Sequence, residues 1–156
     1  VLSFSVFNNI NEWCGVIIYS GGANKYIGSP FGLPQGAAIE LVRVALNGKQ
    51  ESTSKAIAIS LKLIKKYAPL VKLIISYADK DQNHIGTIYQ ATNWIYIGKY
   101  GDNAVCNKIV NGRKLHNRSI GSLYGTHSIE KLQSVGLNVI PVRSKGKYKY
   151  IYPIDI

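Results

Sequence analysis

The pattern of hydrophobic and polar positions predicts a chain of short strands with three helices among them. Apolar and polar residues alternate at the N-terminus, where Leu2, Phe4 and Val6 would share one face of a strand. Over residues 53–67 the apolar positions instead recur every three or four residues, as on one side of a helix. The expected strands are 1–7, 14–19, 39–46, 71–77, 94–98, 138–143 and 148–152, and the expected helices are 53–67, 85–93 and 126–135.

The order of these elements indicates an α/β fold. Strands and helices alternate in the middle of the chain, which is typical of an α/β sheet. We expect antiparallel hairpins at both ends, with residues 144–147 as the turn of the second one. Residues 102–118 show no regular pattern, and the length of 156 residues suits one domain. The sequence therefore predicts a single domain over residues 1–156, with one mixed, mostly antiparallel central sheet flanked by helices.

The charge balance changes this picture by indicating a partner. The chain has 19 Lys and Arg residues against 8 Asp and Glu, a formal net charge of +11. A surplus of this size favours a polyanion, because neutralising phosphates releases their counterions. We expect double-stranded DNA, bound by basic residues of the second half of the chain: Lys108, Arg113, Lys114, Arg118, Lys145, Lys147 and Lys149.

Several features bear on where the protein works. Cys14 and Cys106 form no cluster in the sequence and fit a reducing compartment. No apolar run reaches the roughly 18 residues that a membrane span needs, and the first residues do not resemble a signal peptide. We expect a cytoplasmic protein that does not enter a membrane. Because Met is absent even at position 1, we also expect that the chain is either processed or lacks an N-terminal segment; the oligomeric state stays open, a dimer included.

The middle of the chain is its most informative part. A long strand, a Ser-capped helix, a second strand and a short helix bearing a Tyr follow one another in an order that resembles the core of the GNAT acetyltransferases. The stretch Ile88-Tyr-Gln-Ala-Thr-Asn-Trp94 is similar to the GNAT pattern Leu-Tyr-x-x-x-Gly-Phe, which puts Tyr89 in the place of the general acid. The glycines of the usual acetyl-CoA loop are missing, and Gly48-Lys-Gln-Glu-Ser-Thr-Ser-Lys55 stands in their place.

A narrower resemblance covers residues 1–152. The stretch Ser76-Tyr-Ala-Asp-Lys-Asp-Gln-Asn-His-Ile-Gly-Thr-Ile-Tyr-Gln-Ala-Thr-Asn-Trp94 resembles the signature of the phage Mom family, and Ile39-Glu-Leu-Val-Arg43 and Gly146-Lys-Tyr-Lys-Tyr-Ile-Tyr152 match it as well. That family comprises GNAT-related enzymes that add a carbamoylmethyl group to adenine in phage DNA and so shield it from host restriction. The resemblance implies a transferase that acts on the exocyclic amine of adenine.

By the same resemblance, functional positions of the family fall on Arg43, Ser54, Asp79 and Tyr89. Arg43 would clamp a carboxylate or phosphate, and Ser54 would donate a hydrogen bond to the donor of the transferred group. Asp79 would accept a hydrogen bond from the adenine amine. Tyr89 would manage the proton of the leaving group.

Further candidates complete the expected site. Family members carry a His on a segment before the first strand, which is where this sequence begins. Either that segment was lost or His84 takes part instead. Glu40 is a second candidate base, because GNATs often carry one on the equivalent strand. Residues at the start of the expected helix would hold the donor of the transferred group: Ser52, Thr53, Ser54 and Lys55.

The cofactor and two other functions stay open at this point. The sequence does not name the donor of the transferred group; an acyl-CoA-type donor fits the fold, although the usual glycines are absent. We expect no metal in the site, but Asp79, Asp81 and His84 offer ligand types that suit iron. The alternatives are a non-catalytic DNA-binding relic of such an enzyme, and a GNAT acyltransferase acting on a small-molecule or protein amine.

The chemistry also predicts how the substrate is presented. An amine that is engaged in base pairing is reached only when the base leaves the stack. The Gly- and Pro-rich loop 20–36 carries Tyr26 and Phe31, and its length and aromatic residues suit it to hold an extruded base.

Overall fold

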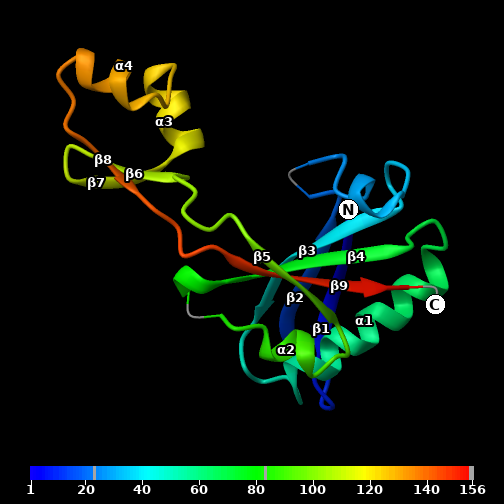
Figure 1. Cartoon of the computed structure of the whole chain (residues 1–156). Helices are drawn as coiled ribbons and strands as arrows, with labels where there is room; N and C mark the ends of the chain where they lie inside the picture. The colour runs from blue at the N-terminus through cyan, green and yellow to red at the C-terminus, as the bar shows by residue number, and fades with distance from the viewer. Residues whose placement is uncertain (23, 83, 155–156) are drawn as a thin grey trace. The chain divides into compact units, whose positions relative to one another are not determined.

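The computed structural model describes residues 1–22, 24–82 and 84–154, which fold as a mixed α/β protein (Figure 1). The α/β class predicted from the sequence is confirmed. The chain forms two compact units: the first comprises Val1–Ala78, His84–Gly98 and Tyr148–Ile156, and the second comprises Asp79–Asn83 and Lys99–Lys147. That the whole chain acts as one domain stays a prediction.

A six-stranded sheet forms the framework of the first unit. Its strands lie in the order β1-β2-β3-β4-β9-β5. The strands β1 and β2 form the expected N-terminal hairpin, β2 also pairs antiparallel with β3, and β3 pairs parallel with β4, so the sheet is mixed as predicted. The bounds are β1 Leu2–Phe7, β2 Trp13–Ser20, β3 Ala38–Leu46, β4 Leu73–Asp79, β5 Ile95–Tyr100 and β9 Lys147–Pro153.

One face of this sheet is covered by helix α1, which spans Thr53–Tyr67 as predicted. The helix begins there because Ser52 caps it: its Oγ accepts a hydrogen bond from the backbone N–H of Lys55 at 3.0 Å. It ends just before Pro69, which disfavours helical backbone in the residue ahead of it. The buried side of α1 packs against the strands in a core that includes Ile57, Leu61, Ile64, Ile17, Tyr19, Leu41 and Ile74.

The opposite face of the sheet is covered by the Gly- and Pro-rich loop. Alternate residues of β4 point to opposite faces, so Ile74 joins the core under α1 while Leu73 and Ile75 face the loop. Ile27 and Phe31 of the loop pack there, and the short 3₁₀ helix η1, Ser29–Phe31, shapes it. The described part of this loop is therefore a packed cover of the sheet.

The second unit has a small sheet of its own. Strand β6 (Asn107–Val110) lies between β7 (Arg113–His116) and β8 (Val139–Val142), and both pairings are antiparallel. Helices α3 (Asn117–Tyr124) and α4 (Ile129–Ser134) complete the unit (Figure 1). A separate hydrophobic core joins these elements; its buried members are Val110, Ile120, Leu132 and Val139.

Three sequence predictions are corrected here. The strands lie in two sheets instead of one, and residues 102–118, expected to be irregular, contain the β6–β7 hairpin and the start of α3. The last two strands form no hairpin, because β8 pairs with β6 while β9 lies between β4 and β5.

The short helices also differ in extent from the prediction. Helix α2 covers Thr87–Gln90 instead of 85–93, since Gly86 before it and Asn93 after it both adopt left-handed backbone, with φ of 84° and 61°. A further 3₁₀ helix, η2, spans Lys80–Gln82. None of the helices in the described part of the chain is long and apolar enough to cross a membrane.

Candidate functional site

A cleft opens in the first unit where two parallel strands stop pairing. The pairing of β3 with β4 runs from Ala38 opposite Leu73 to Glu40 opposite Ile75, whereas β3 continues to Leu46. Beyond this point lies a cleft of about 550 Å³. Its lining residues come from β3, the following loop, the start of α1, β4, and the segment that ends in α2: Leu41, Val42, Arg43, Val44, Leu46, Gly48, Gln50, Thr53, Tyr77, His84, Ile88 and Tyr89.

Three of the expected catalytic residues, Arg43, His84 and Tyr89, line this one cleft although they are up to 46 positions apart in the sequence. The side chains of Arg43 and His84 are exposed, so both can meet a ligand that enters from solvent. The cleft thus combines a guanidinium, an imidazole and a phenol.

Tyr89 occupies the buried end of this arrangement. It is 8% exposed, and its ring packs against Trp94 and Tyr150 at centroid distances of 5.2 and 5.1 Å. Its Oη lies 2.8 Å from Oγ of Ser76. Gly86 makes this packing possible, because a Cβ at that position would overlap the Tyr150 ring. The ring contacts and the hydroxyl contact together fix where the phenol points.

The protonation state of Tyr89 follows from these surroundings. Burial raises the pKa of its hydroxyl above the ordinary value, a hydrogen bond from Ser76 opposes that change, and the charge of Glu40 adds to it. The hydroxyl therefore keeps its proton at neutral pH. A phenol in this state is suited to donate a proton or a hydrogen bond, which agrees with a general acid.

Glu40 reaches the same region from β3. Its side chain is half-buried, and its Oε2 approaches Gly22 so closely that a Cβ on Gly22 would lie 2.6 Å from it. Glu40 is not among the described residues that line the cleft, although its charge raises the pKa of Tyr89. A base role for Glu40 stays a prediction.

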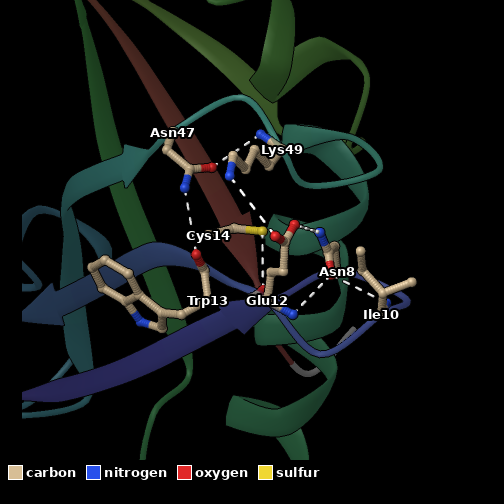
Figure 2. A network of polar contacts seen from close by, with 7 residues as sticks. All are labelled: Asn8, Ile10, Glu12, Trp13, Cys14, Asn47 and Lys49. Carbon is tan, nitrogen blue, oxygen red and sulfur yellow. Dashed lines mark hydrogen bonds and ion pairs between the residues drawn. The ribbon is translucent and has the colours of Figure 1, made fainter.

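The loop after β3 is tied to the N-terminal hairpin by a set of polar contacts (Figure 2). The backbone N–H of Asn47 donates to the carbonyl of Cys14 at 2.9 Å, and its side-chain amide donates to the carbonyl of Trp13 at 3.4 Å. Asn47 Oδ1 accepts from the backbone N–H of Lys49, whose ammonium lies 3.9 Å from Glu12. These contacts hold in place the loop that enters the cleft.

The residues at the start of α1 divide into two roles. Gln50 and Thr53 line the cleft and hold each other through a 3.2 Å hydrogen bond from Nε2 to Oγ1. Ser52 uses its hydroxyl to cap the helix, and Lys55 pairs with Glu51 at 2.5 Å. Of the four residues expected to hold the donor, Thr53 is the one among the described lining residues, while Ser54 follows it directly in the helix.

Asp79 ends β4 and belongs to the second unit. Its Oδ1 accepts a hydrogen bond from the backbone N–H of Asp81 at 2.9 Å, which closes the turn after the strand. Hydrogen bonds from Lys145 N–H and the Ser144 hydroxyl lower the pKa of Asp81, which is a structural role. Across residues 1–22, 24–82 and 84–154, no three His, Cys, Asp or Glu side chains gather closely enough to hold a metal ion.

Most of the basic residues expected at DNA are exposed, and these belong to the second unit: Arg113, Lys114, Arg118, Lys145 and Lys147. Lys149 is half-buried in the first unit, with its ammonium 5.3 Å from the Phe31 ring centroid and 6.0 Å from that of Tyr77. Lys108 is 3% exposed and donates to Oδ1 of Asn117. Its burial does not fit the expected phosphate contact, and its role in this structure is to support the second unit.

Sequence reasoning missed two polar residues of this region, Ser76 and Gln50. Ser76 stands in an apolar strand between Ile75 and Tyr77, and a lone hydroxyl in such a run is a signal that could have identified it. Gln50 lies in a polar loop among similar residues, so the sequence offers no comparable signal for it.

The sequence matches a known protein family along its whole length. No curated protein matches the sequence. The family model described as the Mom protein family matches residues 1–156, the entire chain. The match therefore includes both units and every residue that lines the cleft. The chain belongs to the Mom protein family, and this membership implies a function in the modification of phage DNA.

Proposed function

We propose that the chain is a transferase that modifies the exocyclic amine of adenine in DNA with a carbamoylmethyl-type group, and so protects phage DNA from restriction. The observation that carries this proposal is the cleft in which Arg43, His84 and Tyr89 meet. Each of the three has the chemistry that one part of a group transfer to an amine requires: an anion clamp, a proton acceptor and a proton donor.

A GNAT-related fold is part of the proposal. In support of it, two neighbouring parallel strands stop pairing at the cleft, a loop and the start of a long helix follow the first strand, and a short helix bearing Tyr89 follows the second. The same order of elements characterises GNAT cores. The polar loop Gly48–Ser52 takes the place of the glycine-rich loop, so the donor differs from an ordinary acyl-CoA in how its anionic part is held.

The donor of the transferred group is a small molecule with a carboxylate or phosphate. Arg43 presents a planar, permanently charged guanidinium that pairs with such groups through two hydrogen bonds. Thr53 lies in the first turn of the 15-residue helix α1, where the helix dipole favours negative charge. Ser54 and Gln50 supply neutral polar groups beside it. An anionic donor therefore has two sources of attraction in the cleft, Arg43 and the start of α1.

The acceptor is an adenine that has left the base stack. Its amine is a weak nucleophile because the lone pair is delocalised into the ring, so a base must increase its reactivity. The resemblance assigns Asp79 to this hydrogen bond, although Asp79 is not among the described residues that line the cleft. Within the first unit, His84 and Glu40 are the further candidate acceptors of a proton. Tyr89, protonated at neutral pH, donates to the group that leaves the donor. None of the described residues of loop 20–36 is among those that line the cleft, so the support of an extruded base by Tyr26 and Phe31 stays a prediction.

Double-stranded DNA binds through the exposed basic residues of the second unit. That unit has ten Lys and Arg residues against four Asp and Glu, so it attracts phosphates as a whole. Contacts of this kind position a duplex without reading its sequence. The protein would act in the host cytoplasm, where phage DNA is exposed to restriction enzymes.

Mass spectrometry of nucleosides tests this proposal. Plasmid DNA is isolated from cells that express the chain and from cells with an empty vector, and both are digested to nucleosides. We expect a new, heavier deoxyadenosine species from the first sample only, with a mass increase that identifies the added group. DNA that is bound but unmodified would contradict the proposal and favour a non-catalytic binding protein. Tight acetyl-CoA binding with acylation of a small-molecule amine would favour an ordinary GNAT acyltransferase.

A further inference from the structure

Ser76 lies on β4 at the point where that strand stops pairing with β3. The last pair of the parallel ladder is Glu40 with Ile75, so the next residues along the two strands are Leu41 and Ser76. Ser76 is 1% exposed, and its Oγ lies 3.3 Å from the carbonyl oxygen of Leu41. The side chain of Ser76 thus bonds a backbone group at the end of the ladder, where the cleft begins.

The same oxygen atom also contacts Tyr89. Ser76 Oγ lies 2.8 Å from Tyr89 Oη, within hydrogen-bond distance. A serine hydroxyl has one proton and two acceptor sites, so it can donate to only one of its two neighbours at a time. When it donates to Leu41, it accepts from the Tyr89 hydroxyl; when it donates to Tyr89, the phenol proton is free for another acceptor.

We propose that Ser76 is a positioning residue that orients the Tyr89 hydroxyl and turns its own proton toward the Tyr89 oxygen when that oxygen carries negative charge. The inference rests on the proposed function, in which Tyr89 donates a proton. Leu41 is an alternative acceptor for the serine proton, so the hydroxyl stays satisfied in both arrangements. A buried hydroxyl with two satisfied states can change direction without leaving a polar group unpaired.

The electrostatics of Tyr89 agree with this role. Burial is the largest influence on its pKa and raises it, while the hydrogen bond from Ser76 lowers it. Removing the Ser76 hydroxyl takes away the lowering contribution and leaves the burial in place. The phenol should then hold its proton more tightly and become a weaker acid.

The chain offers a matched control for this test. Ser60 is 2% exposed, its Oγ lies 2.6 Å from Tyr19 Oη, and it also bonds the carbonyl of Ile57. This second buried serine–tyrosine pair has the same chemistry as the first. Tyr19 is not among the described residues that line the cleft. Ser60→Ala therefore removes an equivalent hydrogen bond from the core without touching the candidate site.

The direct test is a fluorine NMR titration of protein labelled with 3-fluorotyrosine, which makes every phenol more acidic and thus titratable while the protein is folded. Tyr89→Phe identifies the Tyr89 signal. We expect Ser76→Ala to move the Tyr89 titration to higher pH and Ser60→Ala to leave it near its original position. An unchanged Tyr89 titration in Ser76→Ala, or an equal shift in Ser60→Ala, would overturn the inference.

Turnover measurements distinguish a positioning role of Ser76 from a role in packing alone. Tyr89 must be protonated to act, so turnover falls as pH rises through its pKa, and Ser76→Ala should move that fall to higher pH. At neutral pH we expect roughly tenfold lower turnover with unchanged DNA binding, and Ser76→Thr, which keeps the hydroxyl, should restore turnover. Equal turnover and pH profile in wild type and Ser76→Ala would count against the inference. If no protein modifies DNA, the proposed function fails, while the NMR titration still decides whether Ser76 governs Tyr89.

Discussion

Tyr89 brings a hydroxyl group into the hydrophobic core of the first unit. Two aromatic neighbours, Trp94 and Tyr150, are in direct ring contact with the phenol, and its burial keeps it protonated. The sequence indicated Tyr89 because its motif and place in the element order are local features. It did not indicate Ser76, since that residue meets Tyr89 only after a strand and a helix have packed together.

Gly86 provides a stability test at the scale of one residue. Gly86→Ala should lower the free energy of unfolding by about 2–4 kcal/mol, because left-handed backbone is strained for Ala and the added Cβ overlaps the Tyr150 ring. Gly36→Ala is the control: its φ of 89° is similar, but no atom lies within 4 Å of the added Cβ. Urea unfolding measures both. Equal losses in the two variants would show that Gly86 has no packing role.

At the scale of elements, a helix or strand is predictable from the sequence when the interactions that determine it lie within its own segment. Helix α1 was predicted with its observed bounds, because its cap, its apolar period and Pro69 are all read within the segment. The β6–β7 hairpin was missed although Asn111-Gly112 between its strands is a strong turn signal, and both residues adopt positive φ. Strands β8 and β9 join different sheets because each pairs with strands that are distant in the sequence, and no local pattern encodes such pairing.

Two serines at the start of α1 are expected to have different roles, Ser52 in stability and Ser54 in function. Ser52→Ala removes the helix cap and should lower the free energy of unfolding by about 1 kcal/mol. Ser54→Ala leaves that cap intact, so we expect a smaller change in stability but a clear loss of turnover, in keeping with contact to the donor. Thermal unfolding and the DNA-adduct assay are measured on the same preparations. A loss of stability in Ser54→Ala as large as in Ser52→Ala, with normal turnover, would reverse this assignment.

At the scale of the whole molecule, the chain has two compact units that differ in their hydrophobic cores and in their exposed charges. The first contains the cleft and most of the apolar core, whereas the second is small and rich in exposed basic residues. Net charge predicted a polyanion partner without locating the surface, because charge counts do not say which lysines are buried. Lys108 illustrates this, since it is one of the innermost residues of the second unit.

The salt dependence of DNA binding tests the role of the second unit. Each phosphate contact contributes about 0.9 to the slope of log K against log salt, so Arg113→Ala and Arg118→Ala should each reduce that slope by about one. Lys62→Ala, an exposed residue of α1, serves as the control for loss of one charge. Lys108→Ala should instead destabilise the protein, because Oδ1 of Asn117 loses the hydrogen bond that Lys108 donates to it. Equal slopes in wild type, Arg113→Ala, Arg118→Ala and Lys62→Ala would exclude the second unit as the DNA contact.

The most direct test of the central claim compares DNA adducts made by wild type, Tyr89→Phe and Tyr19→Phe. Each variant removes one buried phenol oxygen. Of the two tyrosines, Tyr89 lines the cleft, whereas Tyr19 is not among the described lining residues. Adducts are quantified by nucleoside mass spectrometry on plasmid DNA, with circular dichroism to verify folding. We predict a loss of about 10²–10⁴-fold in turnover for Tyr89→Phe, the usual worth of general acid–base catalysis, with near wild-type turnover for Tyr19→Phe. Near wild-type adduct levels from folded Tyr89→Phe would contradict the account.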